Sequence, residues 1–253
     1  MTIYSWNVNG IRAAHKKGFM DWFTQANGDI VCVQETKARK EQLPDDLAEP
    51  EGYYSFWASA KKPGYSGVAL YSRLKPLEVE ALGVREFDDE GRTLIAFFDN
   101  FAVASCYFPN SQQEGARLDY KLAYCAALKA RIDELVSKGI NVVISGDYNI
   151  AHKPIDLARP EANENNPGYL PEEREWMSFF LDSGYTDTFR MFTNEGGHYT
   201  WWSYRARARE KDIGWRIDYH CVNSAFSSRV RESVILKDVM GSDHCPIKLI
   251  IDV

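Results

Sequence analysis

The chain has 253 residues, of which 45% are hydrophobic, and its formal net charge is −6. This apolar fraction is ordinary for a globular protein, and no apolar run approaches the roughly 20 residues that a membrane-spanning helix needs. The acidic balance argues against a nonspecific nucleic-acid coat, which is normally basic, but it is compatible with a nucleic-acid enzyme. Because no signal segment, repeat or linker is visible, we expect one soluble, intracellular domain over residues 1–253.

The five cysteines predict neither a zinc site nor a disulfide framework. They are scattered, odd in number and mostly flanked by apolar residues, and no CxxC pair occurs. Such cysteines behave as small buried hydrophobes in a reducing compartment, which indicates the cytoplasm. They are Cys32, Cys106, Cys125, Cys221 and Cys245.

The first half of the chain predicts several strands and two helices. Residues 11–26 carry large apolar residues at helical spacing, and residues 114–138 form the clearest amphipathic helix, which Gly139 ends. Short runs rich in Tyr, Phe, Val and Ile are typical of strands. We expect such strands at residues 2–8, 29–34, 53–58, 67–73, 93–98 and 102–108. The apolar stripe of the long helix consists of Leu118, Leu122, Cys125, Leu128, Ile132 and Leu135.

The second half repeats this mixture of strands and helices. A buried strand is expected at residues 142–147, a loop rich in Asn and Pro at 153–170, and a helix from Pro171 to about Ser183. Mixed strands with a few long helices suit two sheets packed face to face, with the helices outside. The remaining strands are expected at residues 198–203, 216–222, 230–236 and 246–252.

The strand at 142–147 leads into a polar segment that contains Asp147 and Asn149. Side chains two residues apart on an extended chain point to the same side, so the carboxylate and the amide could face one site at the end of the sheet. The alternative is a turn in which both side chains satisfy their own backbone. Five further strand-like runs also end in polar groups, which favours a shared site. They lie at residues 6–10, 33–37, 107–111, 216–219 and 241–246.

These segments hold residues suited to metal-assisted hydrolysis of a phosphodiester. Oxygen ligands are typical of magnesium or manganese sites, not of zinc sites. A histidine with a carboxylate partner, here His244 with Asp218, is fixed in one tautomer and becomes more basic. Asp147 could position the attacking water. Neither a GxSxG nor a GxxxxGK[ST] motif offers a competing chemistry. The oxygen ligands are Glu35, Asp243, Asn7 and Asn9.

The same segments resemble the signature blocks of the exonuclease III family of abasic-site (AP) endonucleases. The blocks are WNVNGIRA from residue 6, QETK from residue 34, SGDYNIAH from residue 145, WRIDY from residue 215 and GSDHCP from residue 241. Their order holds across essentially the whole chain. The resemblance implies the DNase-I-like four-layer α/β sandwich, in which two mixed sheets are flanked by helices. It also implies Mg²⁺ as the cofactor, with Mn²⁺ as a substitute.

The resemblance assigns roles to individual residues. Glu35 resembles the principal metal ligand, with Asn7, Asn9 and Asp243 beside it. The catalytic group is implied to be Tyr107, Asp147, Asn149, Asp218 and His244. Trp201, Trp215 and Ile217, with Thr200 and Trp202, resemble the pocket for a flipped, baseless deoxyribose. Further DNA contacts are implied at Asn110, Asn163 and Asn166, at Arg205, which would insert into the duplex, and at Arg207 and Arg209.

The resemblance therefore implies a monomeric endonuclease that cleaves duplex DNA 5′ to an abasic site, with some 3′-phosphodiesterase or 3′–5′ exonuclease activity. It leaves a 3′-hydroxyl and a 5′-deoxyribose phosphate, and no membrane is involved. Two alternatives keep the fold: a phosphodiesterase or phosphatase for a small phosphate ester, and a non-catalytic nucleic-acid-binding relative. The tryptophan blocks favour DNA over a small ester, and the intact acids, amides and histidine argue against a non-catalytic protein.

Overall fold

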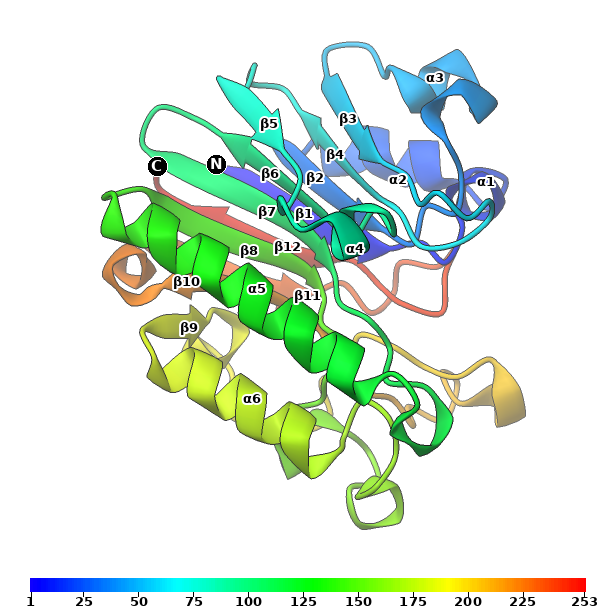
Figure 1. Ribbon diagram of the computed structural model, residues 1–253. Coiled ribbons are helices and arrows are strands. Elements are labelled where there is room, and N and C mark those ends of the chain that lie inside the picture. Colours follow the sequence, from blue (N-terminus) through cyan, green and yellow to red (C-terminus); the bar gives the residue numbers. More distant parts are fainter.

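The computed structural model describes residues 1–253 and contains two six-stranded sheets packed face to face (Figure 1). The first sheet has the order β11-β12-β1-β2-β4-β3, and the second has the order β5-β6-β7-β8-β10-β9. Each sheet has one parallel pair at its centre, β1 with β2 and β7 with β8, and its other pairs are antiparallel. The strands are β1 (Thr2–Asn7), β2 (Ile30–Gln34), β3 (Tyr54–Ala58), β4 (Val68–Ser72), β5 (Glu78–Glu80), β6 (Thr93–Phe97), β7 (Phe101–Tyr107), β8 (Asn141–Asp147), β9 (Tyr185–Asp187), β10 (Asp218–Asn223), β11 (Val230–Ile235) and β12 (Ile247–Ile251).

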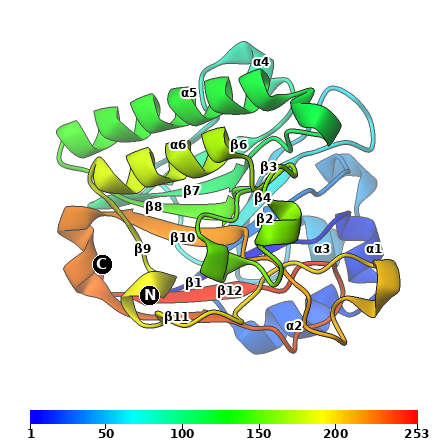
Figure 2. The same cartoon turned by 90° about the horizontal axis from the view of Figure 1, so that it is seen from below.

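Helices cover both outer faces, which produces the expected four layers. The long helices α5 (Leu118–Ser137) and α6 (Pro171–Asp182) pack on the second sheet, and α2 (Phe19–Ala26) packs on the first (Figure 2). Three short helices complete the set, and no helix has the length and apolar composition needed to cross a membrane. The short helices are α1 (Ile11–His15), α3 (Asp45–Ala48) and α4 (Arg85–Asp88).

The central strands are buried on both faces, which explains their continuous apolar sequences. In β2, Ile30 and Cys32 enter the core between the sheets, whereas Val31 and Val33 pack toward the helices of the first sheet. Successive side chains of a strand point to opposite faces, so one five-residue run supplies two cores. The same alternation occurs in β8, where Val143 faces the other sheet.

Two expected elements differ from the structure. The single helix expected at 11–26 is two helices, because Gly18 adopts a left-handed φ of 91° between them. The strand expected at 198–203 is absent, since Trp201 makes only isolated bridges, to Trp215 and to His244. The sequence also did not reveal β5, β9, α3 or α4, each of which is too short to display a hydrophobic period.

Candidate active site

The polar segments at the strand ends meet at one edge of the two sheets. Because β1 and β2 are parallel, Asn7 and Glu35 emerge at the same edge, and β7 and β8 deliver Tyr107 opposite Asp147 in the same way. The antiparallel strand β10 begins at this edge, where Asp218 pairs with Asp147. The segment 241–246 arrives there too, since it precedes β12, the antiparallel neighbour of β1.

A cavity of about 360 Å³ opens at this edge, and most of the expected site residues line it. Asn7 and Asp218 are buried directly behind the lining, in contact with it. Asn163 and Arg205 do not line it. The lining consists of Asn9, Glu35, Tyr107, Asn110, Asp147, Asn149, Asn166, Pro167, Gly168, Trp201, Trp215, Ile217, Asp243 and His244.

Asp147 and Asn149 do converge, but through a turn and not through strand alternation. Asn149 has a left-handed φ of 52°, so the chain is no longer extended there. Its backbone N–H donates to Oδ1 of Asp147 at 2.8 Å, and its side-chain Nδ2 donates to Oδ2 at 3.2 Å. The turn interpretation and the site interpretation therefore describe the same local structure.

Four non-glycine residues at or beside the cavity have left-handed backbone. Asn9, Glu35, Lys37 and Asn149 all have φ between 46° and 56°, although none of them is glycine. Such conformations are uncommon outside glycine, and they cluster at functional sites where the surrounding contacts hold them in place. Here they turn the side chains of Asn9, Glu35 and Asn149 into the cavity.

His244 and Asp218 form a buried hydrogen-bonded pair. Nδ1 of His244 lies 2.8 Å from Oδ2 of Asp218, and Nε2 lies 3.9 Å from Oδ2 of Asp147. Burial alone would lower the pKa of His244, but Asp218, Asp147 and Asp243 outweigh it and raise that pKa to about 10. His244 is therefore an imidazolium at neutral pH, and its Nε2–H side faces the carboxylate of Asp147.

Asp147 is the most strongly perturbed carboxyl group of the site. Its burial and the negative charge of Asp218 raise its pKa, against the effects of His244 and of the hydrogen bonds from Asn7 and Asn149. A carboxyl group with a raised pKa is a stronger base than an exposed aspartate. Burial and the charges of Glu35 and Asp147 also raise the pKa of Tyr107 well above its usual value, so its phenol stays neutral.

The expected metal ligands gather on one side of the cavity. Nζ of Lys37 lies 2.9 Å from Oε1 of Glu35 and donates to Oδ1 of Asn9 at 2.5 Å, and Nδ2 of Asn9 donates to Oδ1 of Asp243 at 3.0 Å. These carboxylate and amide oxygens fit a hard divalent cation. The amide oxygen of Asn7 already accepts a hydrogen bond from the backbone N–H of Asn9 at 2.9 Å. Asn7 therefore holds the neighbouring metal-ligand candidates in place.

Asp243 stays charged beside these groups. Burial would raise its pKa, but His244 and the hydrogen bonds from Asn9 and Trp201 lower it. A second cluster, Asp147, Asp218 and His244, also brings possible metal-ligand atoms within 4.8 Å of one another. In that cluster the Asp218 and His244 atoms bond to each other, so the Glu35 side fits a cation better.

Two tryptophans and an isoleucine form an apolar wall of the cavity. The rings of Trp201 and Trp215 meet edge to face at 6.1 Å, and Ile217 lies beside them. Nε1 of Trp201 donates to Oδ2 of Asp243 at 3.1 Å, which ties the wall to the acidic side. The expectation for Trp202 was wrong, because its ring is buried in a separate cluster away from the cavity. Thr200 is buried behind the wall and bonds to backbone amides.

The residues expected to contact DNA divide into two groups. Asn110 and Asn166 line the cavity, and Asn163 supports Asn166 through a 2.8 Å hydrogen bond. Arg205 is exposed on the loop beyond Trp202. Arg209 does not fit a phosphate contact, because its guanidinium donates to the carbonyl groups of Ser242, Lys237 and Val239.

Sequence reasoning missed several residues around the site. Lys37 lies within a recognised block but was given no role, although it contacts both Glu35 and Asn9. Arg92 donates to the carbonyl group of Tyr107 at 3.0 Å, and its guanidinium lies 5.0 Å from that ring. Lys121 is a charged residue on the buried face of α5, and this anomaly in the apolar pattern was a readable signal.

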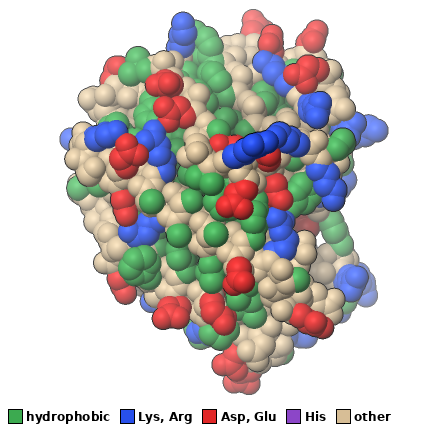
Figure 3. Space-filling view, viewed as in Figure 1, with side chains coloured by type: hydrophobic (Ala, Val, Ile, Leu, Met, Phe, Trp, Pro, Cys, Tyr) green, Lys and Arg blue, Asp and Glu red, His purple; other side chains and the backbone are tan.

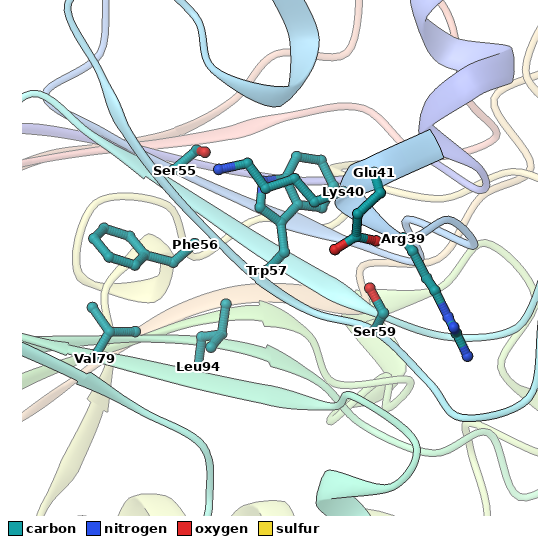
Figure 4. Close-up of a pocket in the computed structure, with 9 residues that line it drawn as sticks. All are labelled: Arg39, Lys40, Glu41, Ser55, Phe56, Trp57, Ser59, Val79 and Leu94. Carbon is teal, nitrogen blue, oxygen red and sulfur yellow. The ribbon is translucent and has the colours of Figure 1, made fainter. Parts of the chain in front are cut away.

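Other cavities lack this combination of groups. One of about 500 Å³ lies at the open edge of the sandwich, where Phe56 of β3 faces Val79 of β5, and Trp57, Arg39 and Lys40 adjoin it (Figure 4). None of the expected site residues lines it. Acidic and basic side chains are interspersed over the face seen in Figure 3, with no continuous basic band.

Known proteins resemble this chain over its full length. Residues 4–244 match the Endonuclease/Exonuclease/phosphatase family. The exodeoxyribonuclease of Bacillus subtilis (strain 168) is 44% identical over 256 residues, with 100% of both chains covered. The DNA repair nuclease APEX1 of Danio rerio is 41% identical, with 100% of this chain and 83% of that protein covered. The AP endonuclease LMAP from Leishmania major superposes with a TM-score of 0.88 at 28% identity, covering 98% of this chain and 86% of that one.

Proposed function

The chain belongs to the endonuclease/exonuclease/phosphatase family, and from this premise we propose that it is a Mg²⁺-dependent endonuclease that repairs DNA. It hydrolyses the phosphodiester 5′ to an abasic site in duplex DNA, leaving a 3′-hydroxyl and a 5′-deoxyribose phosphate. It also removes blocking groups or nucleotides from 3′ ends. The relatives named as an exodeoxyribonuclease, a DNA repair nuclease and an AP endonuclease support this reading.

One observation carries the proposal: hydrolytic groups and an apolar wall share the same cavity. The Asp147, Asp218 and His244 cluster lies on one side, the acids Glu35 and Asp243 on another, and the wall of Trp201, Trp215 and Ile217 completes it. A baseless deoxyribose has no base to stack or pair, so its extrusion into such a pocket costs less than flipping a normal nucleotide. A site for a small phosphate ester would not need this wall.

In the proposed reaction, Asp147 and Asn149 place the attacking water. The two side chains are joined by a 3.2 Å hydrogen bond, and the raised pKa of Asp147 suits it to accept a proton from water. Nδ2 of Asn7 donates to Oδ2 of Asp147 at 2.8 Å, so this carboxylate is held at a fixed point. The water gives a proton to Asp147 as its oxygen attacks phosphorus, and the bond from phosphorus to the 3′-oxygen breaks. The 3′-oxygen leaves with the bonding electron pair and takes up a proton, from the Tyr107 phenol or from water, to become the 3′-hydroxyl.

The charge that develops on the phosphate faces His244, whose imidazolium is maintained by Asp218. The neutral phenol of Tyr107 can donate a hydrogen bond to an oxygen of the reacting group. Glu35 and Asp243, with Asn9, are the residues that would hold Mg²⁺, which supplies neutralisation of phosphate charge. Mn²⁺ accepts the same oxygen ligands and should substitute.

A basic hollow beside the cavity extends the proposed DNA surface. It has a volume of about 700 Å³, and Arg12, Lys16 and Lys37 are among its lining residues. Arg12 and Lys16 are exposed, and Lys37 connects the hollow to Glu35. Cations placed along a groove neutralise backbone phosphates without reading sequence, which lets an acidic protein bind DNA locally.

A nicking assay tests the proposal. A labelled duplex with one internal tetrahydrofuran residue is incubated with Mg²⁺, with Mn²⁺ and with chelator, beside an identical duplex without the lesion. We expect a single nick 5′ to the lesion with either metal and none with chelator. Glu35→Ala and Asp147→Asn serve as inactive controls. Absence of a lesion-specific nick with Mg²⁺ would overturn the endonuclease assignment, and hydrolysis of small phosphate esters alone would favour the phosphatase alternative.

A further inference from the structure

A fully buried ion pair lies directly behind one wall of the active site. Nζ of Lys121, on α5, lies 2.6 Å from Oε1 of Glu173, on α6, and both side chains are 0% exposed. Charged side chains are rarely buried this completely, because removal from water is costly even when they are paired. The position of the pair between two helices therefore calls for an explanation beyond packing.

Lys121 reaches past this pair to the backbone of the site. Its Nζ donates to the carbonyl oxygen of Asn149 at 2.7 Å, and no backbone amide donates to that oxygen. Asn149 has a left-handed φ of 52°, and its carbonyl oxygen faces Lys121 of α5. The ammonium thus supplies a donor to a buried carbonyl group that no backbone amide reaches.

Glu173 ties two other segments to the same point. Its Oε1 accepts from the hydroxyl of Ser111 at 2.5 Å, and its Oε2 accepts from the backbone N–H of Leu170 at 2.9 Å. Ser111 directly follows Asn110, and Leu170 lies two residues after Gly168. Both Asn110 and Gly168 line the cavity. Three lining segments from separate parts of the chain therefore converge on one ion pair.

We propose that Lys121 and Glu173 are positioning residues for hydrolysis, and that they hold Asn149 and Asp147 in the geometry that places the attacking water. The inference rests on the proposed nuclease function. Asn149 passes the constraint on, because its amide nitrogen donates to Asp147 and to the carbonyl group of Phe108, and its amide oxygen accepts from Asn110. Neither Lys121 nor Glu173 lines the cavity, so they act only through these residues.

A purely stabilising role predicts a different outcome from a positioning role. Replacing a buried ion pair by neutral residues is often neutral for stability, whereas removing one partner strands a buried charge and is strongly destabilising. If the pair only stabilises the fold, restoring stability should restore activity. If it positions Asn149, activity should depend on a donor to the Asn149 carbonyl group, whatever the stability.

Three variants separate these roles. Lys121→Met removes the donor and strands Glu173, so we expect both the melting temperature and kcat to fall. In the double variant Lys121→Met with Glu173→Gln, the melting temperature should recover toward wild type, since a glutamine can still cap α6 and no charge is stranded. Its kcat on the tetrahydrofuran duplex with Mg²⁺ should stay about 100-fold below wild type, because a catalytic group misplaced by about 1 Å lowers the rate by that factor. The KM for the duplex should change far less. Glu173→Gln alone keeps the lysine donor and should keep most of kcat.

Arg131→Met is the matched control. Arg131 lies on the same helix and pairs with Glu80 at 2.6 Å, far along α5 from the cavity. It should lose some stability with kcat unchanged. The inference is overturned if the double variant regains wild-type kcat together with its melting temperature, or if Lys121→Met keeps full kcat. Failure of the wild-type protein to nick the duplex would instead overturn the nuclease assignment itself.

Discussion

A Cβ atom at Gly146 would lie 1.9 Å from the carbonyl oxygen of Cys106, because β7 and β8 approach closely just before Tyr107 and Asp147. The obstructing atom is backbone in the middle of a sheet and cannot move aside as a flexible side chain could. The residue that precedes Asp147 must therefore be glycine if the two strands are to present Tyr107 and Asp147 as neighbours.

Gly146→Ala should destabilise the protein by roughly 3 kcal/mol and abolish most nicking activity, since overpacking here displaces Asp147. Thermal and urea unfolding measure the first effect, and the nicking assay measures the second. Gly139→Ala is the control: Gly139 also has positive φ, 82°, but nothing lies within 4 Å of its added Cβ. In that variant the free energy of unfolding should fall by about 1–2 kcal/mol, and kcat should stay unchanged. Equal effects of the two variants would contradict the close-approach argument.

Asp218→Asn should lower kcat by about 10²–10³-fold, the range for loss of one group that stabilises the developing charge. Among the groups that raise the pKa of His244, Asp218 contributes most, so its neutralisation lowers that pKa. The imidazolium is then lost at a lower pH, and the alkaline limb of the rate profile should move to lower pH. Single-turnover rates from pH 6 to pH 10 check this shift. Asp182→Asn, at the exposed end of α6, is the control. An unshifted alkaline limb would show that His244 does not act as a cation.

His220 makes folding stability depend on acidity. Burial lowers its pKa to about 4, while Nδ1 lies 2.7 Å from the hydroxyl of Ser145 and Nε2 has no hydrogen-bond partner. Between pH 6.5 and 4, His220 is protonated in the unfolded chain but not in the folded chain. The contribution of neutral His220 to the free energy of unfolding is therefore fully present above pH 6.5 and is lost as the pH falls. From pH 7.5 to 5 the loss should be on the order of 2 kcal/mol. Urea unfolding of His220→Asn should give a lower free energy of unfolding at pH 7.5 and a smaller decrease as the pH falls. If the variant and the wild type lose stability equally with falling pH, His220 is not the cause.

Arg205 and Arg209 should behave differently although they lie four residues apart. Arg209→Ala removes three hydrogen bonds from a guanidinium to carbonyl groups, so it should lower stability by about 1–3 kcal/mol and leave the salt dependence of DNA binding unchanged. Arg205→Ala removes an exposed side chain, so stability should hold, and the slope of log affinity against log salt should fall by about 1. Fluorescence anisotropy with the abasic duplex in chelator measures both slopes. A slope change in Arg209→Ala alone would reverse this assignment.

Most of the strands and the two longest helices could be predicted from the sequence because their hydrophobic patterns are local. The central strands β2 and β8 have continuous apolar sequences, and α5 has a stripe of period 3.6. The stripe was rotated in the prediction, since Leu118 and Leu122 are only half-buried whereas Lys121 and Tyr124 are buried. Lys121 interrupts the apolar pattern of this face, but its partner Glu173 lies 52 residues away, so the sequence does not show what pairs with it.

The site could be predicted as a set of residues but not as a geometry. Strand-end polar groups and the family resemblance pointed to the residues that line the cavity. The reason given for the convergence of Asp147 and Asn149 was strand alternation, whereas the structure uses a left-handed residue. Trp202 and Arg209 could not be separated from Trp201 and Arg205 by sequence, because tertiary contacts alone bury Trp202 and occupy Arg209.

Asn7 donates one amide proton toward Glu35 and the other toward Asp147, and thus spans the two sheets near the start of the chain. His244 completes the same cavity near its end. The cavity is therefore complete only when β1 and the segment that leads into β12 pair in one sheet, so a fragment that lacks residues 241–246 should show no nicking activity.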